Sequence, residues 1–579
     1  MKKIRLTING TEVYTAPGTT ILEAAKEAGI KIPTLCYLKG INDTGACRMC
    51  VVEVEGKNDL VSSCNTLAED GMVIQTNTKK IQHSRRTSLE LILSDHPFVC
   101  ATCTKDQTCE LQKIADELDY SMYYGFYRNP VTLFRGQPSG GSIDMSGYSI
   151  TRDSEKCIRC RRCVEVCDKI QSVHAIRADE NGFASTIVPF IGSKLSDTDC
   201  VSCGQCVRVC PTGALQIRDD VDKVKAALAD PDKVVICQTA PSVRVGLAEA
   251  CGAESGTVAT GKMVSAIRKL GFDKVFDTNF GADLTIMEEA NELIERVKSG
   301  GDMPMFTSCC PAWVRFAEEF YPDMTGNLST SKSPQAMFGA VLKTWYAQKN
   351  NIDPEKIVCV SVMPCTAKKS EIAREEMMNS GLRNVDISIT VVELARLMKA
   401  KGVYLDQIDE KEFDSVMGDS TGADALFGAS GGVMEAALRT AVEASGGKHG
   451  DIEFREVRGA RGIREASVDI GGKTLKVAMV SGLANARDVL DGIKAGELCY
   501  DFVEVMACPG GCINGGGMPA SPDKDVRTPR TEGIYKVDRS MQVRKSHENS
   551  SVQALYDEFL GKPLSAMAED LLHRTYEEV

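Results

Sequence analysis

Little in this 579-residue sequence suits a membrane or a nucleic acid. No apolar run approaches the roughly 18 residues that a membrane-spanning helix needs. Acidic residues outnumber basic ones by 80 to 68, and the net charge of −12 disfavours nucleic acid and anionic membrane surfaces as partners. The first residues, MKKIRLTING, alternate like a strand and lack the apolar stretch and cleavage site of a signal peptide. We therefore expect a cytoplasmic protein.

Cysteine, in contrast, is abundant. Cytoplasmic chains rarely use disulfides, so the 24 cysteines leave zinc, iron–sulfur clusters and catalysis as alternatives. Nineteen of them fall into groups that could each hold metal, and the chain is long enough for several domains. Four others stand apart, and we expect them to be small buried hydrophobic residues: Cys237, Cys251, Cys359 and Cys499.

Residues 1–78 predict a small domain around four cysteines. A strand–turn–strand–helix pattern, with a helix starting near Thr19 or Thr20, favours a β-grasp fold. The spacing C-x10-C-x2-C-x13-C allows one [2Fe–2S] cluster, and on spacing alone zinc stays an alternative. The segment resembles the N-terminal [2Fe–2S] domain of complex I large subunits and several hydrogenases, which implies an iron–sulfur cluster. The implied ligands are Cys36, Cys47, Cys50 and Cys64.

Residues 79–118 hold one histidine and three cysteines in the order H-x3-C-x2-C-x5-C. One imidazole and three thiolates suit either zinc or a [4Fe–4S] cluster. The position directly after the first domain matches the His-plus-three-Cys cluster of the same families. That resemblance implies a [4Fe–4S] cluster on His96, Cys100, Cys103 and Cys109. Residues 119–150, which contain RGQPSGGS, are expected to be a linker.

Residues 151–220 contain two similar cysteine runs, each C-x2-C-x2-C-x3-C, which indicate an internal duplication. In two-cluster ferredoxins the fourth cysteine of each run binds the other cluster. The pattern therefore predicts a ferredoxin-like domain with two [4Fe–4S] clusters. One would be held by Cys157, Cys160, Cys163 and Cys210, and the other by Cys200, Cys203, Cys206 and Cys167.

From residue 221 to residue 579, strand-like runs alternate with helical ones, which predicts an α/β domain with largely parallel sheets covered by helices. The complete chain is thus expected to be a multidomain protein of α/β and α+β parts. Three segments follow strand-like runs directly: TSCCPAW at 307–313, VMPCTAKKSE at 362–371 and VMACPGGCINGGG at 505–517. Open α/β sheets bind ligands at this end of their strands.

These three segments supply four thiols for a further cluster: Cys310, Cys365, Cys508 and Cys512. Separate buried cysteines are the alternative. Pro311 is suited to the first position of a helix, which places Cys310 near its N-cap. Adjacent side chains of an extended segment point in opposite directions, so one member of the Cys309–Cys310 pair can bind metal while the other faces elsewhere.

The same segments resemble the three signature motifs of [FeFe]-hydrogenases, over residues 221–579. The upstream cysteine groups resemble the larger, clostridial-type members of this family. The resemblance implies reversible reduction of protons to H2 at an H-cluster, in which a cysteine joins a [4Fe–4S] cluster to a two-iron subsite with CO, cyanide and azadithiolate. In this sequence Cys310, Cys365 and Cys508 would hold the [4Fe–4S] part, and Cys512 would be the shared thiolate.

The resemblance also implies roles for other residues. Cys309 would exchange protons with the azadithiolate, and a proton path would continue through Glu289, Glu292, Arg296 and Ser329. On the sequence alone, these two glutamates would be a solvated helix face and Lys368 a surface lysine. The family pattern makes Lys368 a donor to cyanide. The pocket would be lined by Pro241, Ser242, Ser333, Gln335, Met363, Phe427 and Met506, while His547 and His573 would have structural roles in a C-terminal wrapping segment.

The electron partner is the remaining question. The sequence has no convincing glycine-rich dinucleotide fingerprint, so we expect it not to use NAD(P)H directly. Its N-terminal region resembles catalytic subunits of NAD(P)-linked hydrogenases, some of them electron-bifurcating, at least as well as it resembles stand-alone ferredoxin-dependent enzymes. This implies ferredoxin, a flavin-containing diaphorase subunit and a small [2Fe–2S] subunit as partners, and maturases for the two-iron subsite. Arg161 and Arg162 are candidates for a docking patch. An H2 sensor or an electron-transfer subunit without turnover is the alternative function, although the presence of Cys309 favours an enzyme.

Overall fold

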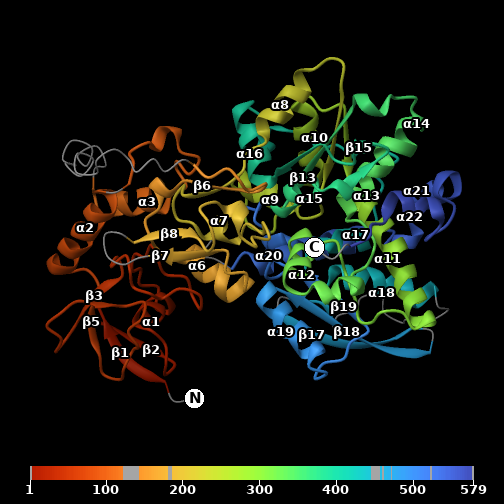
Figure 1. Ribbon diagram of the computed structural model, residues 1–579. Coiled ribbons are helices and arrows are strands. Elements are labelled where there is room, and N and C mark those ends of the chain that lie inside the picture. Colours follow the sequence, from red (N-terminus) through yellow and green to blue (C-terminus); the bar gives the residue numbers. More distant parts are fainter. Residues whose placement is uncertain are drawn as a thin grey trace.

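The computed structural model describes residues 3–94, 96–120, 143–179, 185–444, 457–459, 462–470, 472–521 and 525–576. The segment RGQPSGGS, for which we expected a linker, lies outside these residues. Figure 1 shows a small N-terminal lobe, a central region and a larger lobe formed by the rest of the chain. Within the described residues, no helix is both long and apolar enough to cross a membrane.

The N-terminal lobe is built on a five-stranded sheet with the strand order β2-β1-β5-β3-β4. A tight turn at Asn9 and Gly10, both with positive φ, joins β1 to β2, as expected for a hairpin of this length. Helix α1 begins after Thr20, whose side chain accepts a hydrogen bond from the Glu23 amide at 3.3 Å. The strands are β1 (Ile4–Ile8), β2 (Thr11–Thr15), β3 (Val51–Val54), β4 (Val61–Ser62) and β5 (Val73–Gln75), and α1 spans Ile21–Glu27.

The central region consists of short elements that carry the next cysteine groups (Figure 1). The duplication expected from the sequence is visible in two short helices, α6 (Arg162–Val166) and α7 (Gln205–Val209). Each begins after a residue in the left-handed region, Arg161 at φ 63° and Gly204 at φ 73°. The other elements are α2 (Lys79–Ser94), α3 (Glu110–Glu117), β6 (Ile150–Arg152), β7 (Ile176–Asp179), β8 (Thr186–Pro189) and β9 (Leu215–Ile217).

The large lobe contains two four-stranded sheets. The first, in the order β11-β10-β13-β16, is entirely parallel, as the alternating pattern predicted. The second, in the order β12-β19-β18-β17, is parallel except for β17, which pairs with β18 in antiparallel register. The strands are β10 (Val234–Thr239), β11 (Lys274–Asp277), β12 (Met305–Phe306), β13 (Ile357–Met363), β16 (Ile387–Thr390), β17 (Ile463–Ile470), β18 (Lys473–Ser481) and β19 (Phe502–Met506).

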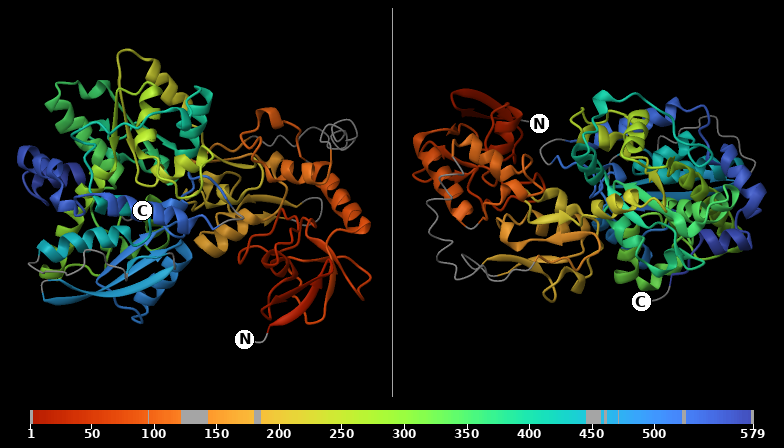
Figure 2. Two further views of the ribbon diagram at one scale, coloured as in Figure 1. Left: turned by 180° about the vertical axis from the view of Figure 1, so that it is seen from behind. Right: turned by 90° about the horizontal axis from the view of Figure 1, so that it is seen from above.

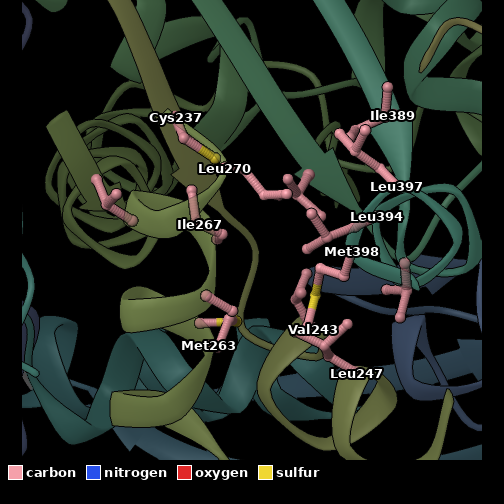
Figure 3. Close-up of a cluster of buried hydrophobic side chains, with 14 of the residues drawn as sticks. Cys237, Val243, Leu247, Met263, Ile267, Leu270, Ile389, Leu394, Leu397 and Met398 are labelled. Carbon is pink, nitrogen blue, oxygen red and sulfur yellow. The ribbon is translucent and has the colours of Figure 1, made fainter. Parts of the chain in front are cut away.

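Helices cover these sheets on both sides and enclose the core (Figures 1 and 2). Figure 3 shows one part of that core, where Cys237 of β10 lies among apolar side chains of the helices on the first sheet. The main helices are α8 (Val221–Ala229), α9 (Val243–Ala250), α10 (Thr260–Lys269), α11 (Asn279–Ser299), α12 (Pro311–Phe320), α13 (Pro334–Val341), α15 (Ala367–Glu371), α16 (Val391–Ala400), α17 (Gly422–Ala425), α18 (Gly432–Ala444), α19 (Leu483–Lys494), α20 (Arg527–Ser540), α21 (Ser550–Leu555) and α22 (Ala566–Leu572).

The C-terminal segment is attached to the lobe by buried charges. Arg439 of α18 is fully buried and pairs with Asp538 of α20 at 2.9 Å and with Glu435 at 2.6 Å. Arg544 pairs with the other oxygen of Asp538 at 2.5 Å. Burial alone would raise the pKa of Asp538, but the hydrogen bonds from Arg439 and Arg544 outweigh it and lower the pKa. The two family-suggested histidines also make contacts of a structural kind: His573 lies 3.0 Å from Glu288, and His547 lies 3.2 Å from Thr440.

Replacing Asp538 by Asn should therefore destabilise the protein by about 3–5 kcal/mol, because buried arginines lose a carboxylate partner. Since the pKa of Asp538 is lowered by folding, its contribution is present above the normal aspartate range and is lost as the pH falls. The difference between wild type and variant in thermal unfolding should accordingly shrink in acid. The control is Glu532→Gln, which removes an exposed pair with Arg539 and should cost less than about 1 kcal/mol. Equal effects of the two substitutions would contradict this account.

Candidate active site and metal centres

The three cysteine segments meet where strands of the two sheets end. Cys310 follows β12 and is the N-cap of α12, with Pro311 at the first helical position as predicted. Cys365 follows β13, and Cys508 follows β19. The Ala507 amide lies 3.5 Å from the Cys310 sulfur, which joins the first segment to the third. Cys512 begins a short 3-10 helix, Cys512–Asn514, rather than following a strand directly.

All four thiols lie close enough to influence one another. Burial raises the pKa of Cys512 well above its ordinary value, and the thiols of Cys365, Cys310 and Cys508 raise it further. As metal ligands they would have to be thiolates, and four buried thiolates are costly unless a cation neutralises them. The donor set therefore fits a metal cluster rather than four independent hydrophobic cysteines.

The glycines of the third segment allow this close approach. A Cβ on Gly515 would lie 2.2 Å from the Pro364 carbonyl oxygen, and one on Gly511 would lie 2.5 Å from the Ser430 nitrogen. Gly511 also has φ 97°, a conformation that side chains rarely adopt. The segment 505–517 can thus fold against the second segment only with glycine at these positions.

The spacing of the sulfurs bears on the zinc alternative. Within the described residues, the one group of three or more potential ligand atoms lying within 4.8 Å of one another is Glu443, His547 and Glu548. Four thiolates around a single zinc ion, with Zn–S bonds of about 2.3 Å, would be closer together than that. The cysteine groups are too widely spaced for one metal ion, which fits clusters of several iron atoms.

The first domain gathers its four cysteines as two pairs. The sulfurs of Cys50 and Cys64 are 3.4 Å apart, and the Cys36 and Cys47 thiols interact directly. Two thiolates for each of two metal ions is the arrangement that a [2Fe–2S] cluster requires. The interaction lowers the pKa of Cys36 and raises that of Cys47, so without a metal the two thiols share a proton.

The second group surrounds a small cavity. Its lining includes all four predicted ligands, His96, Cys100, Cys103 and Cys109. The Nδ1 atom of His96 is buried and has no hydrogen-bond partner, and burial lowers the pKa of His96 to about 4. His96 is therefore neutral at physiological pH, the form in which imidazole binds metal. Gly213 closes the cavity, since a Cβ there would lie 2.8 Å from the Cys103 sulfur.

The two ferredoxin-like groups form in the crossed arrangement expected from the sequence. One cavity is lined by Cys157, Cys160 and Cys163 of the first run together with Cys210 of the second. In the other group, the thiols of Cys200 and Cys167 act on Cys206. This second group reaches the catalytic segment, because the Gln205 amide donates to the Cys508 sulfur at 3.1 Å.

Cys309 lies between the metal-binding thiols and buried acids, since Cys310, Cys512 and Glu289 all act on its thiol. It is 8% exposed, and burial together with the charge of Glu289 raises its pKa well above the ordinary thiol value. Glu289 is fully buried, and the Ser329 hydroxyl and the Ser308 amide lie near its carboxyl. Burial and the neighbouring Glu292 raise the pKa of Glu289 to about 8. The surface interpretation of these glutamates is therefore wrong.

A hydrogen-bonded chain continues from Glu292. Ser329 donates to one of its carboxylate oxygens at 2.8 Å, and Arg296 pairs with the other at 2.6 Å. The Arg296 side chain is 14% exposed, so this chain approaches the surface. The structure thus brings together all of the residues for which the sequence suggested a proton path.

Lys368 is buried rather than a surface lysine. Its ammonium donates to the Cys309 carbonyl at 3.1 Å and to Glu371 at 2.9 Å. Glu371 also accepts hydrogen bonds from Ser333 and Gln335, two of the pocket residues proposed from the sequence. Sequence reasoning missed Glu371, although its position three residues after Lys368 on a short helix is a usable signal.

The other proposed pocket residues lie at the same ends of the strands and helices. Met363 and Met506 are the last residues of β13 and β19, and Ser242 donates to the Gly428 carbonyl at 3.3 Å, beside Phe427. Pro241 comes two residues after β10. All of them are buried, and four of the five are apolar: Pro241, Ser242, Met363, Phe427 and Met506.

Two expectations need correction. Cys237 and Cys359 are buried, but Cys251 and Cys499 are exposed, so the four unassigned cysteines are not all core residues. Arg162 cannot belong to a docking patch, because its side chain is only 1% exposed. It points inward because Glu110 of α3 holds it at 2.8 Å, a contact between segments that local sequence does not reveal.

Comparison with known proteins identifies the domains. A family described as the iron only hydrogenase large subunit, C-terminal domain, matches residues 233–516, and the iron hydrogenase small subunit matches residues 524–579. Upstream, a 2Fe-2S iron-sulfur cluster binding domain matches residues 1–79, the NADH-ubiquinone oxidoreductase-G iron-sulfur binding region matches 85–122, and a 4Fe-4S dicluster domain matches 156–223.

Individual relatives agree along the whole chain. The NADP-reducing hydrogenase subunit HndD of Solidesulfovibrio fructosivorans is 47% identical, with 100% of this chain and 99% of the relative aligned. Iron hydrogenase 1 of Clostridium pasteurianum is 41% identical, with 99% of each chain aligned. The structure of apo [FeFe]-hydrogenase HydA1 from Chlamydomonas reinhardtii is 42% identical, covers 62% of this chain and 99% of that one, and has a TM-score of 0.56. This chain therefore belongs to the iron-only, or [FeFe], hydrogenases, oxidoreductases that act on H2, and it carries accessory iron–sulfur domains.

Proposed function

We propose that the chain interconverts protons and H2 at an H-cluster, in the reaction 2H⁺ + 2e⁻ ⇌ H2. Cys310, Cys365 and Cys508 would hold its [4Fe–4S] part, and Cys512 would bridge to the two-iron subsite. When bound, that subsite with its CO, cyanide and azadithiolate ligands supplies the chemistry of making and breaking the H–H bond. The protein supplies thiolate ligation, an apolar pocket and a route for protons.

One observation carries this proposal: a protonated thiol stands between the four-thiol group and a chain of buried acids. The raised pKa of Cys309 keeps it protonated, so it can donate a proton and then recover one from Glu289. Glu289 would exchange its proton with Glu292 and Ser329, and Arg296 would hold Glu292 in position near the surface. We assign Lys368 to donate to a cyanide ligand while Glu371 holds it in place.

The accessory cofactors follow from the donor sets. We propose one [2Fe–2S] cluster in a β-grasp domain at residues 1–78 and a His-ligated [4Fe–4S] cluster at 79–118. Two [4Fe–4S] clusters would lie in a ferredoxin-like domain at 151–220, after a linker at 119–150, and the H-cluster in the domain at 221–579. The contact between Gln205 and Cys508 supports electron entry from the second ferredoxin-like cluster.

The partners are inferred from chemistry and relatives. We propose that electrons pass to or from ferredoxin and a flavin-containing NAD(P) subunit, with a small [2Fe–2S] subunit, in a cytoplasmic complex. The similarity to a protein named as a subunit of an NADP-reducing hydrogenase supports this proposal. Dedicated maturases would install the two-iron subsite. Arg161 remains the candidate for part of a docking patch, without Arg162.

Replacing Cys309 by Ala should leave the iron content unchanged and reduce H2 evolution from reduced methyl viologen by about 100-fold or more, because the proton donor is lost. The matched control is Cys251→Ala, which removes an exposed cysteine outside the site and should leave activity unchanged. Full turnover by the Cys309 variant would remove this thiol from the mechanism. A matured wild-type protein without H2 evolution would overturn the catalytic proposal itself.

The pH dependence of H2 evolution and H2 oxidation should reflect the protonation of Glu289. Because its pKa is about 8, it is protonated below this pH and can supply protons for H2 evolution, which should decline above pH 8. H2 oxidation needs the deprotonated acceptor and should rise over the same interval. Glu289→Gln should lower both rates and abolish this inflection, while Glu295→Gln, an exposed residue of the same helix, should preserve it. An inflection near pH 8 that persists without Glu289 would assign the titration to another group.

Native mass measurement of the protein purified from its own cells tests the proposed complex. We expect an assembly larger than the 62.7 kDa chain, with bound flavin. Isolation as a monomer with complete ferredoxin-linked activity would contradict the complex while leaving the catalytic proposal intact.

A further inference from the structure

Three of the accessory metal groups meet in one buried region, which we call the junction. Its apolar cluster contains Cys36 of the first domain, Cys109 of the second and Cys160 of the ferredoxin-like region. Asn42 links the first domain to the ferredoxin-like region. Its side-chain amide donates to the Cys36 carbonyl and to the Cys160 carbonyl, both at 2.9 Å. Asn42 is 1% exposed, so this link is shielded from water.

A buried arginine of the ferredoxin-like region lies at the junction. Arg162 is two residues after Cys160 and directly before Cys163, and its guanidinium pairs with Glu110, the residue after Cys109, at 2.8 Å. It also lies 3.5 Å from the carbonyl of Val209, the residue before Cys210. Its charge acts on the Cys36 and Cys160 thiols as well. One guanidinium therefore reaches ligand segments of all three groups.

We propose that Arg162 is a shared, fixed positive charge that raises the reduction potentials of the [2Fe–2S] cluster and of the adjacent ferredoxin-like cluster. This inference rests on the cluster assignments of the proposed function. Each cluster gains one negative charge when it accepts one electron, and a nearby cation stabilises that state. In a dry interior a unit charge several ångströms away is only weakly screened, so its effect is large. Arginine suits this role because it stays protonated at all physiological pH values.

Substitution of Glu110 provides a control for which the opposite shift in reduction potential is expected. Its carboxylate partly cancels the Arg162 charge, so removing it should have the reverse effect. The Glu110 side chain is 24% exposed, whereas that of Arg162 is 1% exposed, so the positive charge is the more deeply buried of the two.

The experiment is a redox titration of the full-length protein, followed by electron paramagnetic resonance of the reduced clusters. In Arg162→Gln, the ratio of reduced to oxidised [2Fe–2S] at a fixed potential should fall about tenfold, which equals about 59 mV for one electron. The adjacent ferredoxin-like cluster should shift in the same direction. In Glu110→Gln the ratio should rise, and in Arg162→Lys, which keeps the charge, it should stay close to wild type.

Lys31→Gln is the matched control, because it removes an exposed cation that also pairs with a glutamate, Glu117, and should not shift the potentials. Unchanged potentials in Arg162→Gln with all signals present would overturn the role of Arg162. So would equal shifts in Arg162→Lys and Arg162→Gln, or loss of a cluster from both, because the side chain would then act by shape. Missing [2Fe–2S] or [4Fe–4S] signals in wild-type protein would instead overturn the cluster assignments, and the inference with them.

Discussion

The catalytic region depends on the meeting of strand ends from two separate sheets. The Cys310 sulfur and the Ala507 amide come together from positions 197 residues apart, and Cys365 joins them from the first sheet. Parallel strands point their carboxyl ends toward the same edge, so the fold can gather cysteines that share no local spacing. Closing this arrangement places four thiols in a buried space. As thiolates they would repel one another and lose hydration, so a bound metal cluster would contribute to the stability of the site as well as to its chemistry.

The same close packing connects the catalytic lobe with the electron-carrying region. A Cβ on Gly516 would lie 2.6 Å from the Cys203 carbonyl, and one on Gly204 would lie 2.4 Å from the Thr366 hydroxyl. Thr366 in turn donates to the Ser202 carbonyl at 2.7 Å. Backbone therefore packs directly on backbone where an electron would cross. The glycines at these positions allow the two metal sites to lie close together, and they also give their own loops conformational freedom.

Sequence reasoning succeeded where the signal was local. The start of α12 at Pro311 and the cap at Thr20 depend on spacing within a short segment, and the position of Cys210 beside the first cysteine run depends on a repeated motif. It failed where side chains meet over long distances. Arg162 looked like a surface residue, and Gln205 carried no local signal for its contact with Cys508. The hydrophobic periodicity of a sequence cannot reveal such partners. When another domain buries a residue, the neighbouring residues in the sequence carry no pattern that indicates it.

In the proposed reaction, protons would pass through Cys309, and electrons would arrive on the side of the adjacent Cys310. Cys310 belongs to the thiol group that Gln205 touches through Cys508, the side from which electrons would arrive. Cys309 belongs to the apolar cluster beneath α11, the helix that carries Glu289 and Glu292. Consecutive side chains in an extended segment point to opposite sides. One of two adjacent cysteines can therefore bind the cluster while the other exchanges protons. A proton route mixed with the cluster ligands would place titrating acids against anionic metal sites and disturb both. In the proposed reaction, one residue of the dipeptide binds the cluster and its neighbour meets the acids, so the two routes can adjoin without sharing a side chain.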